Sequence, residues 1–139
     1  MHAKRPTRII LAKTCLDGHD RGVKVLASLL KKQGFEVVYL GLYNTPEMVV
    51  KSAIQEDADL IGLSFLSGEH LSITRKVLDE LDKRNVHDIS VIVGGILPPE
   101  DVEVLLKMGV KKVFRGSLVR EVAEFISSDL IGGDSHRPE

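Results

Sequence analysis

The sequence predicts an α/β domain in which a parallel β-sheet is covered by helices on both faces. Five short aliphatic runs recur along the 139 residues, and they do not alternate with polar residues. Strands that are buried on both faces have this character. Between the runs, apolar residues recur at three- and four-residue spacing, which is typical of amphipathic helices. Aromatic residues make up only 4% of the chain, so the core is expected to be aliphatic.

The predicted strands and helices alternate along the chain. The strands are expected at 9–12, 37–40, 60–63, 91–93 and 113–114. The helical patterns are carried, in order, by Leu26, Leu29 and Leu30; Val50, Ala53 and Ile54; Ile73, Val77 and Leu81; Val102, Leu105 and Leu106; and Val122, Phe125 and Ile126. Alternation within one short domain indicates a doubly wound sheet. Five strands favour the flavodoxin-like strand order 2-1-3-4-5.

Capping residues support these helix boundaries. Thr45 followed by Pro46 is typical of a helix start, with proline in the first turn, and the prolines at 98–99 indicate another start. Gly34 and Gly109 each follow a helical pattern and precede a strand, where C-terminal caps are expected.

Length and charge restrict the class of protein. We expect one domain over 9–130, with a basic lead at 1–8 and a flexible tail at 131–139. The 19 basic and 20 acidic residues nearly cancel, which argues against nucleic acid as a partner. No apolar run approaches the ~20 residues that span a bilayer, so no membrane partner is expected. The basic lead has no secretory apolar region after it, and the single cysteine, Cys15, cannot form an internal disulfide. A cytoplasmic location is the default expectation.

Ligands of such sheets bind outside the carboxyl ends of the strands. The loop at 13–22 is long for a strand-to-helix connection and rich in ionisable groups. A neutral His19 is a candidate metal ligand whose other ring nitrogen would donate to a carboxylate. Asp17 is placed to supply that carboxylate, and Lys13 to orient or balance Asp17. The alternative interpretation is a polar surface loop with incidental charges.

Two functions that are common on this fold do not suit the residues. Flavin-binding members need a hydroxyl-rich phosphate loop and usually an aromatic stacking partner, whereas this loop offers only Thr14 and the chain has no Trp. Receiver domains need an aspartate at the end of the third strand and a lysine after the fifth. Ser64 and Arg115 stand at those positions.

Three short motifs instead give a resemblance to cobalamin-binding domains. Asp17-x-His19-x-x-Gly22 resembles their DxHxxG signature, Ser64-x-Leu66 their SxL element, and Gly94-Gly95 their GG element, each after the appropriate strand. The segment 12–22 is similar to the acyl-CoA mutase version, AKxxLDGHDRG, whereas methyltransferase corrinoid proteins read closer to DVHDIGK. The similarity to methylmalonyl-CoA mutase-type domains covers about residues 8–128. It implies a fold of the cobalamin-binding type.

The resemblance implies a role for each matching residue. His19 would be the lower ligand of cobalt in a base-off cofactor, Asp17 would hold its other nitrogen, and Lys13 would complete this relay, with no further catalytic residue on the chain. Other matching residues would close on the corrin face or line a slot for the displaced dimethylbenzimidazole tail. The residues expected to bind the cofactor in these ways are Gly18, Asp20, Arg21, Gly22, Ser64, Leu66, Gly68, Gly94, Gly95, Gly116 and Ser117.

The chain also departs from the mutase pattern at two loops. The segment 115–117 is shorter than the GPGT element that is frequent after the fifth strand, which affects contacts to the nucleotide tail. After the third strand, the segment 67–70 differs from the frequent AAGH. Glu69 and His70 are candidates for the cofactor edge or a partner contact, although His70 is expected to cap the following helix. For Ser64 and the glycine pair, the competing interpretation is an ordinary turn.

The function that the resemblance implies is that of the small subunit of a two-chain acyl-CoA mutase. Such a subunit holds adenosylcobalamin for radical isomerisation of methylmalonyl-CoA, 2-hydroxyisobutyryl-CoA or a related branched acyl-CoA. It is an isomerase only in a hetero-oligomer with a large (β/α)₈-barrel subunit that binds the acyl-CoA. The alternatives are a corrinoid carrier of a methyltransferase system and a cobalamin-sensing module. Carriers usually have a helical domain before the sheet, and only about eight residues precede the first strand here. A sensor would need an output domain.

Overall fold

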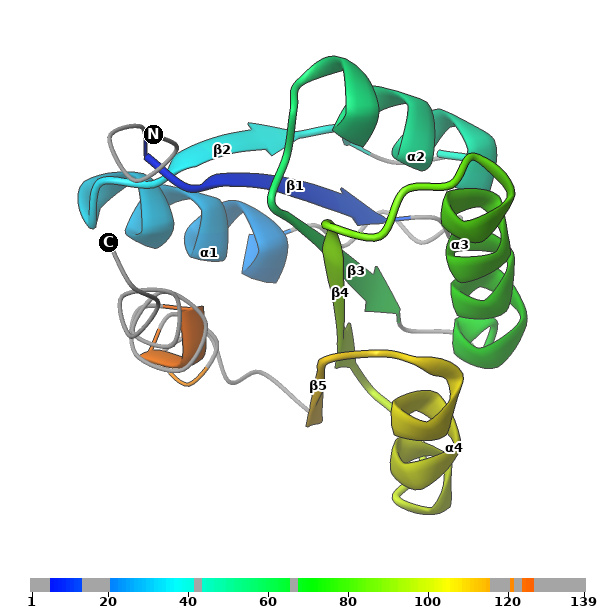
Figure 1. The fold of residues 1–139 in the computed structure, drawn as a ribbon. Coiled ribbons are helices and arrows are strands. Elements are labelled where there is room, and N and C mark those ends of the chain that lie inside the picture. The colour runs from blue at the N-terminus through cyan, green and yellow to red at the C-terminus, as the bar shows by residue number, and fades with distance from the viewer. Residues whose placement is uncertain are drawn as a thin grey trace, which may run out of the picture.

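The computed structural model is a five-stranded parallel sheet with helices on both sides (Figure 1). It describes residues 6–13, 21–41, 44–65, 68–115, 121 and 124–126. The elements are β1 (Arg8–Lys13), α1 (Arg21–Lys32), β2 (Glu36–Tyr39), α2 (Pro46–Gln55), β3 (Leu60–Phe65), α3 (His70–Lys83), β4 (Ser90–Gly95), α4 (Glu100–Met108) and β5 (Lys112–Arg115). The strand order β2-β1-β3-β4-β5 confirms the predicted order. Most of the fifth expected helix, residues 1–5 and the tail at 131–139 lie outside the described residues.

Several strands extend further toward their carboxyl ends than the aliphatic runs indicated. Lys13, Ser64, Gly94 and Gly95 are strand residues rather than loop residues. The pairing explains the difference: Lys13 is in register with Ser64, and Ser64 with Gly94. A ladder is formed by backbone groups, so polar and glycine residues continue it after the aliphatic run has ended. β2 instead ends at Tyr39, one residue earlier than expected.

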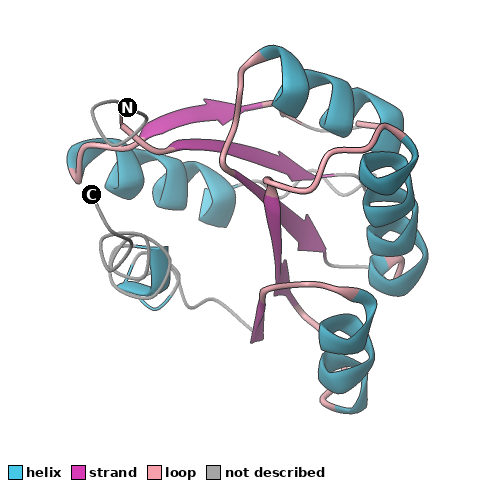
Figure 2. Ribbon diagram, viewed as in Figure 1, coloured by secondary structure: helices cyan, strands magenta, loops and turns pink. Residues whose placement is uncertain are grey.

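The sheet separates two aliphatic cores. Ile10 and Ala12 of β1 belong to a core that also contains residues of α2, α3 and α4. Ile9 and Leu11 belong to a second core that contains residues of α1 and the helical segment at 124–126. Figure 2 shows the helices on the two sides of the sheet. This double coverage confirms the prediction drawn from the non-alternating aliphatic runs.

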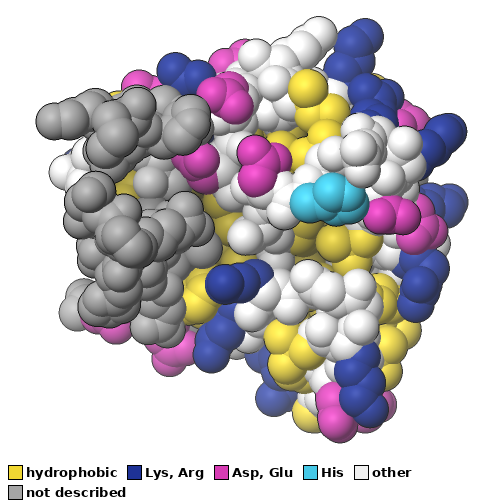
Figure 3. Space-filling view, viewed as in Figure 1, with side chains coloured by type: hydrophobic (Ala, Val, Ile, Leu, Met, Phe, Trp, Pro, Cys, Tyr) yellow, Lys and Arg dark blue, Asp and Glu magenta, His cyan; other side chains and the backbone are white. Residues whose placement is uncertain are grey.

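The space-filling view agrees with amphipathic helices packed on a sheet. Lys, Arg, Asp and Glu side chains lie along much of the rim and at several places within the face in view, and apolar side chains show between them (Figure 3). No helix in the described part of the chain has the length and apolar character needed to cross a membrane.

The capping residues act as the sequence predicted. Thr45 is the N-cap of α2 and its Oγ1 accepts a hydrogen bond from the backbone nitrogen of Met48 at 3.1 Å, while Pro46 is the first helical residue. α4 begins directly after the proline pair at 98–99. Gly109 ends that helix with a φ of 123°, which favours glycine over any other residue.

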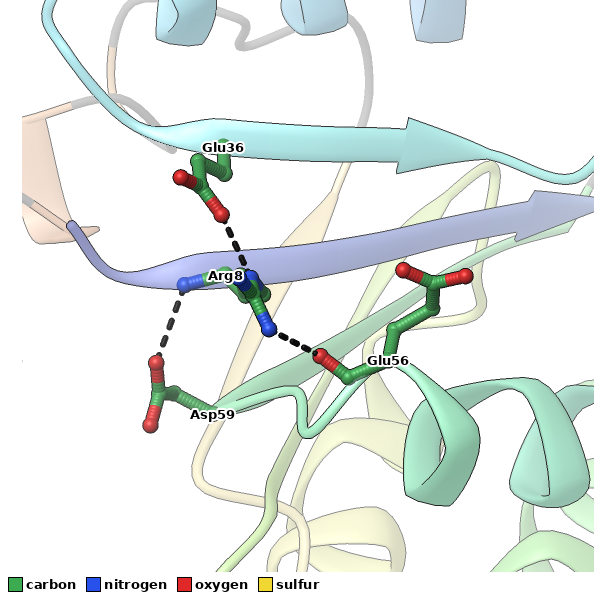
Figure 4. Close-up of polar contacts among 4 residues, drawn as sticks. All are labelled: Arg8, Glu36, Glu56 and Asp59. Carbon is green, nitrogen blue, oxygen red and sulfur yellow. Dashed lines mark hydrogen bonds and ion pairs between the residues drawn. The ribbon is translucent and has the colours of Figure 1, made fainter. Parts of the chain in front are cut away.

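Arg8, at the start of β1, contacts the start of β2, the carboxyl end of α2 and the residue before β3, at the edge of the sheet opposite the predicted site (Figure 4). Its Nε donates to the Glu36 carboxylate of β2, and its Nη1 donates to the Glu56 carbonyl oxygen at 2.7 Å. Its backbone nitrogen donates to Asp59 Oδ2 at 2.9 Å. The hydrogen bond to Glu36 is the main cause that raises the pKa of Arg8. Arg8 therefore stays charged across the working pH range, and the stabilisation is fully present below the ordinary pKa of arginine wherever Glu36 is ionised.

Candidate functional site

Three of the predicted site residues lie side by side at the carboxyl edge of the sheet. Lys13 of β1 pairs with Ser64 of β3, and Ser64 pairs with Gly94 of β4. Paired residues on parallel strands face the same side of a sheet, and residues two apart on one strand share a face. Lys13 therefore lies on the same face as Leu11, which is the face covered by α1. We call Lys13, Ser64 and Gly94 the edge row.

Lys13 is buried within the fold. Its relative exposure is 1%, and it is the largest of the fully buried side chains. Burying an ammonium group is costly unless acceptors are close to it. Lysines of an incidental polar surface are solvated, so this depth favours the interpretation of Lys13 as a site residue.

The two glycines of the GG element, Gly94 and Gly95, differ in whether the fold leaves space for a side chain. A Cβ on Gly95 would lie 1.9 Å from the Phe65 carbonyl oxygen, and the φ of Gly95 is 131°. That oxygen accepts a hydrogen bond from the backbone nitrogen of Ile96 at 3.1 Å, so the chain passes tightly over the end of β3. Among the described residues, a Cβ on Gly94 would meet only Phe114, with its oxygen at 3.5 Å. The fold therefore requires glycine at position 95. Packing does not require it at position 94, which is consistent with a role for Gly94 in binding.

Gly62 is a further small residue on this face of the sheet. It precedes Ser64 by two residues on β3 and therefore shares the face of the edge row. A Cβ at this position would come within 2.7 Å of Leu11 Cδ2. Gly62, Ser64 and Gly94 thus form a strip of small residues on adjacent strands. Gly62 is hard to single out from the sequence because it stands inside an aliphatic run, although a glycine within a strand is itself a signal of close approach.

Ile96 is a second residue that the sequence analysis missed. It follows the glycine pair directly, at the carboxyl edge of the sheet, and 66% of it is exposed. An aliphatic side chain this exposed beside a predicted ligand site is a candidate for contact with a cofactor or a partner. In the sequence, the position of Ile96 directly after the GG element is the feature that could have indicated it as a site residue.

The remaining predicted site residues are only partly covered by the structure. Arg21 and Gly22 are the first two residues of α1, and their side chains are not described. Gly68 has a φ of 86°, which favours glycine, and a Cβ there would meet no atom within 4 Å. The residues that lie outside the described part of the chain are Asp17, Gly18, His19, Asp20, Leu66, Gly116 and Ser117.

His70 does not cap α3, which corrects the expectation from the sequence. The N-cap is Glu69, whose side chain makes no capping hydrogen bond, and His70 is the first helical residue. The buried imidazole instead turns toward α4, where its Nε2 lies 2.7 Å from Asp101 Oδ2. Its ring also packs edge-on against Phe65, with centroids 6.3 Å apart. His70 therefore joins the start of α3 to the start of α4.

Replacing His70 by Phe should lower the free energy of unfolding by about 1 kcal/mol, because Asp101 loses its hydrogen-bond partner. The effect stays near the lower end of the usual range because the Asp101 side chain is 20% exposed and water can reach it. Urea denaturation of the two single variants and of His70→Phe with Asp101→Ala measures the coupling, which we expect to be roughly 0.5 kcal/mol or more. Strictly additive effects would show that the two side chains do not stabilise each other.

A doubly wound sheet with charged, hydroxyl and glycine residues gathered at its carboxyl edge defines a ligand-binding α/β domain. Comparison with known families is more specific: residues 7–125 match the B12 binding domain. The chain therefore belongs to the B12-binding domain family.

Individual relatives narrow the comparison within that family. The chain is 51% identical over 108 residues to the 2-hydroxyisobutanoyl-CoA mutase small subunit of Aquincola tertiaricarbonis, covering 78% of this chain and 79% of that one. It is 40% identical to the pivalyl-CoA mutase small subunit of Xanthobacter autotrophicus, covering 84% and 78%. The chain is thus homologous to small subunits of acyl-CoA mutases.

The solved structures support the same fold. A cobalamin-binding protein from Desulfitobacterium hafniense matches with a TM-score of 0.76 at 23% identity, over 89% of this chain and 59% of that one. The likeness confirms that this chain has the α/β fold seen in that cobalamin-binding protein.

Proposed function

We propose that this chain is the cobalamin-binding small subunit of a two-chain acyl-CoA mutase. The observation that carries the proposal is the 51% identity to a mutase small subunit over most of the length of both chains. The buried Lys13 at the carboxyl edge supports it, because the DxHxxG segment begins only four residues later at Asp17.

The residues at the carboxyl edge suit a base-off cofactor. His19 is proposed as the lower ligand, with Asp17 fixing the tautomer of its imidazole and Lys13 balancing the charge of Asp17. Ser64 and Gly94 are paired small residues at the carboxyl ends of β3 and β4 on the α1 face, whereas Leu60 and Ile92 fill that face further back along the strands. A flat ring system such as dimethylbenzimidazole needs such a surface.

The proposed form of the cofactor is adenosylcobalamin, which when bound supplies the radical chemistry of the carbon-skeleton rearrangement. The contribution of this chain is to hold the cofactor in one orientation and to fix the imidazole beneath it. Binding of the acyl-CoA is assigned to the large subunit. Both mutase relatives are named for branched acyl groups, so we propose a branched acyl-CoA, with 2-hydroxyisobutyryl-CoA as the first candidate and methylmalonyl-CoA as the next.

Electron paramagnetic resonance of bound cob(II)alamin should show splitting by one histidine nitrogen. Protein labelled with nitrogen-15 at its five histidines should convert each triplet into a doublet, because the nuclear spin of the ligand nitrogen changes. The variant His19→Ala should lose the histidine splitting, whereas His70→Phe should retain it. A triplet that persists in the labelled wild-type protein would assign the ligand to dimethylbenzimidazole and contradict the proposed binding mode.

A further inference from the structure

We propose that Asn44 is a positioning residue for the cofactor, because it fixes the point at which the loop carrying His19 leaves the sheet. The inference rests on the proposed function, in which His19 would bind cobalt and Asp17 would orient its imidazole. Asn44 directly precedes Thr45, the N-cap of α2.

Asn44 is buried and directs its amide at the end of β1. Its relative exposure is 8%. Its Nδ2 donates to the carbonyl oxygen of Gly41 at 2.9 Å and to the carbonyl oxygen of Lys13 at 3.3 Å. In return, the backbone nitrogen of Lys13 donates to the same Gly41 oxygen at 3.3 Å. One side-chain amide therefore bridges the last residue of β1 and the loop after β2.

This bridge replaces strand pairing that has already ended. The β1–β2 register runs only to Leu11 opposite Tyr39, and Leu40 makes the last neighbouring bond, to the Leu11 oxygen at 2.9 Å. Lys13 lies two residues beyond Leu11, past the last register pair between β1 and β2. On the other side Lys13 is still paired with Ser64 of β3. The contacts from Gly41 and Asn44 thus complete the support of Lys13 from both sides.

A local feature of Gly41 makes this arrangement possible. Its φ is 83°, a conformation that residues with a side chain rarely adopt. The turn at Gly41 presents a carbonyl oxygen to both the Lys13 nitrogen and the Asn44 amide. Without that amide, the Gly41 and Lys13 carbonyl oxygens lose the donor that they share, while each keeps a backbone donor, the Lys13 nitrogen at 3.3 Å and the Asn44 nitrogen at 3.5 Å respectively.

The expected consequence is a loss of alignment rather than a loss of fold. Lys13 is the last residue of β1 and His19 follows it by six positions, so a shift at Lys13 displaces both the ammonium group and the start of the loop. Groups that orient a metal-bound histidine change affinity by about 10–100-fold when they are removed. Asn44 acts through Lys13 and does not contact the histidine, so we expect its loss to weaken cofactor affinity by about 10-fold, at the lower end of that range.

The test compares Asn44→Ala with Thr45→Ala, its neighbour. Thr45 is the N-cap of α2 and bonds Met48, so its loss weakens the same helix start without removing a bond to Lys13 or Gly41. Absorbance titration with hydroxocobalamin gives the affinity, and the paramagnetic resonance of cob(II)alamin gives the fraction of cofactor bound through histidine. We expect Asn44→Ala to weaken binding about 10-fold and to lower that fraction, with Thr45→Ala close to the wild type in both.

If Asn44 has a purely structural role, the two variants should weaken cofactor binding equally, and that result would overturn the inference. A cofactor affinity of Asn44→Ala within about twofold of the wild type would also overturn it. Should Asn44→Ala fail to fold, Asn44→Asp carries the test. It preserves the shape but sets carboxylate oxygens against two carbonyl oxygens, so it should be no better than Ala. If the wild-type protein itself shows no histidine splitting, the proposed function fails and this inference with it. A normal wild-type spectrum with an unaffected Asn44→Ala removes only the inference.

Discussion

Gly95→Ala should destabilise the fold by about 3 kcal/mol or more, a large fraction of the 5–15 kcal/mol that holds a typical domain folded. The new Cβ would lie 1.9 Å from the Phe65 oxygen and 2.9 Å from two further backbone atoms of Phe65. Backbone cannot move aside as the end of a flexible side chain can, and the φ of 131° adds strain of its own. Urea denaturation followed by circular dichroism measures the loss.

Gly94→Ala is the matched control for this prediction. Its Cβ would stand 3.5 Å from the nearest atom, an ordinary contact, and alanine is somewhat more favourable than glycine inside a strand. Its stability should therefore equal that of the wild type or exceed it by up to about 1 kcal/mol. If Gly94 belongs to the slot for the nucleotide tail, this stable variant should nevertheless bind cobalamin more weakly. A Gly95→Ala protein as stable as Gly94→Ala would show that the turn over Phe65 tolerates a side chain.

The number and kind of elements followed from local features of the sequence, and their order from the usual arrangement of a five-stranded doubly wound sheet. Five unbroken aliphatic runs required five strands buried on both faces, and Thr45, Pro46, Gly34 and Gly109 marked helix ends. Each of these features acts on its own neighbours along the chain, so one sequence suffices to interpret it. The edge row was predicted as well, because the carboxyl ends of parallel strands necessarily meet at one edge.

The contacts that sequence reasoning did not supply depend on distant partners. His70 was expected to cap α3, yet its imidazole bonds Asp101, which lies 31 residues away. Asn44 likewise lies 31 residues from Lys13, and nothing near it in the sequence indicates which carbonyl oxygens it will meet. Gly94 and Gly95 form one motif in the sequence, and the close approach of the Phe65 backbone on the neighbouring strand distinguishes their roles.

The largest expected effect on activity is that of the partner chain. This chain with adenosylcobalamin should isomerise no acyl-CoA, and it should gain mutase activity when a large barrel subunit is added. The chain is of the size of one sheet domain, and the carboxyl edge of that sheet is assigned to the corrin and its tail. Coenzyme A needs a long binding surface of its own, which we assign to the partner. A cofactor that generates radicals must also be covered to exclude water and oxygen.

The assay combines this chain, a large subunit and adenosylcobalamin, with each component also omitted in turn. The large subunit that belongs with the Aquincola tertiaricarbonis relative is a suitable heterologous partner, given the 51% identity between the small subunits. The substrates are 2-hydroxyisobutyryl-CoA, pivalyl-CoA, methylmalonyl-CoA and isobutyryl-CoA. His19→Ala is the control, because it should still fold and yet support little or no turnover. Isomerisation by this chain without a partner would contradict its role as a small subunit. Methyl transfer to a thiol or to tetrahydrofolate without isomerisation would instead identify a corrinoid carrier.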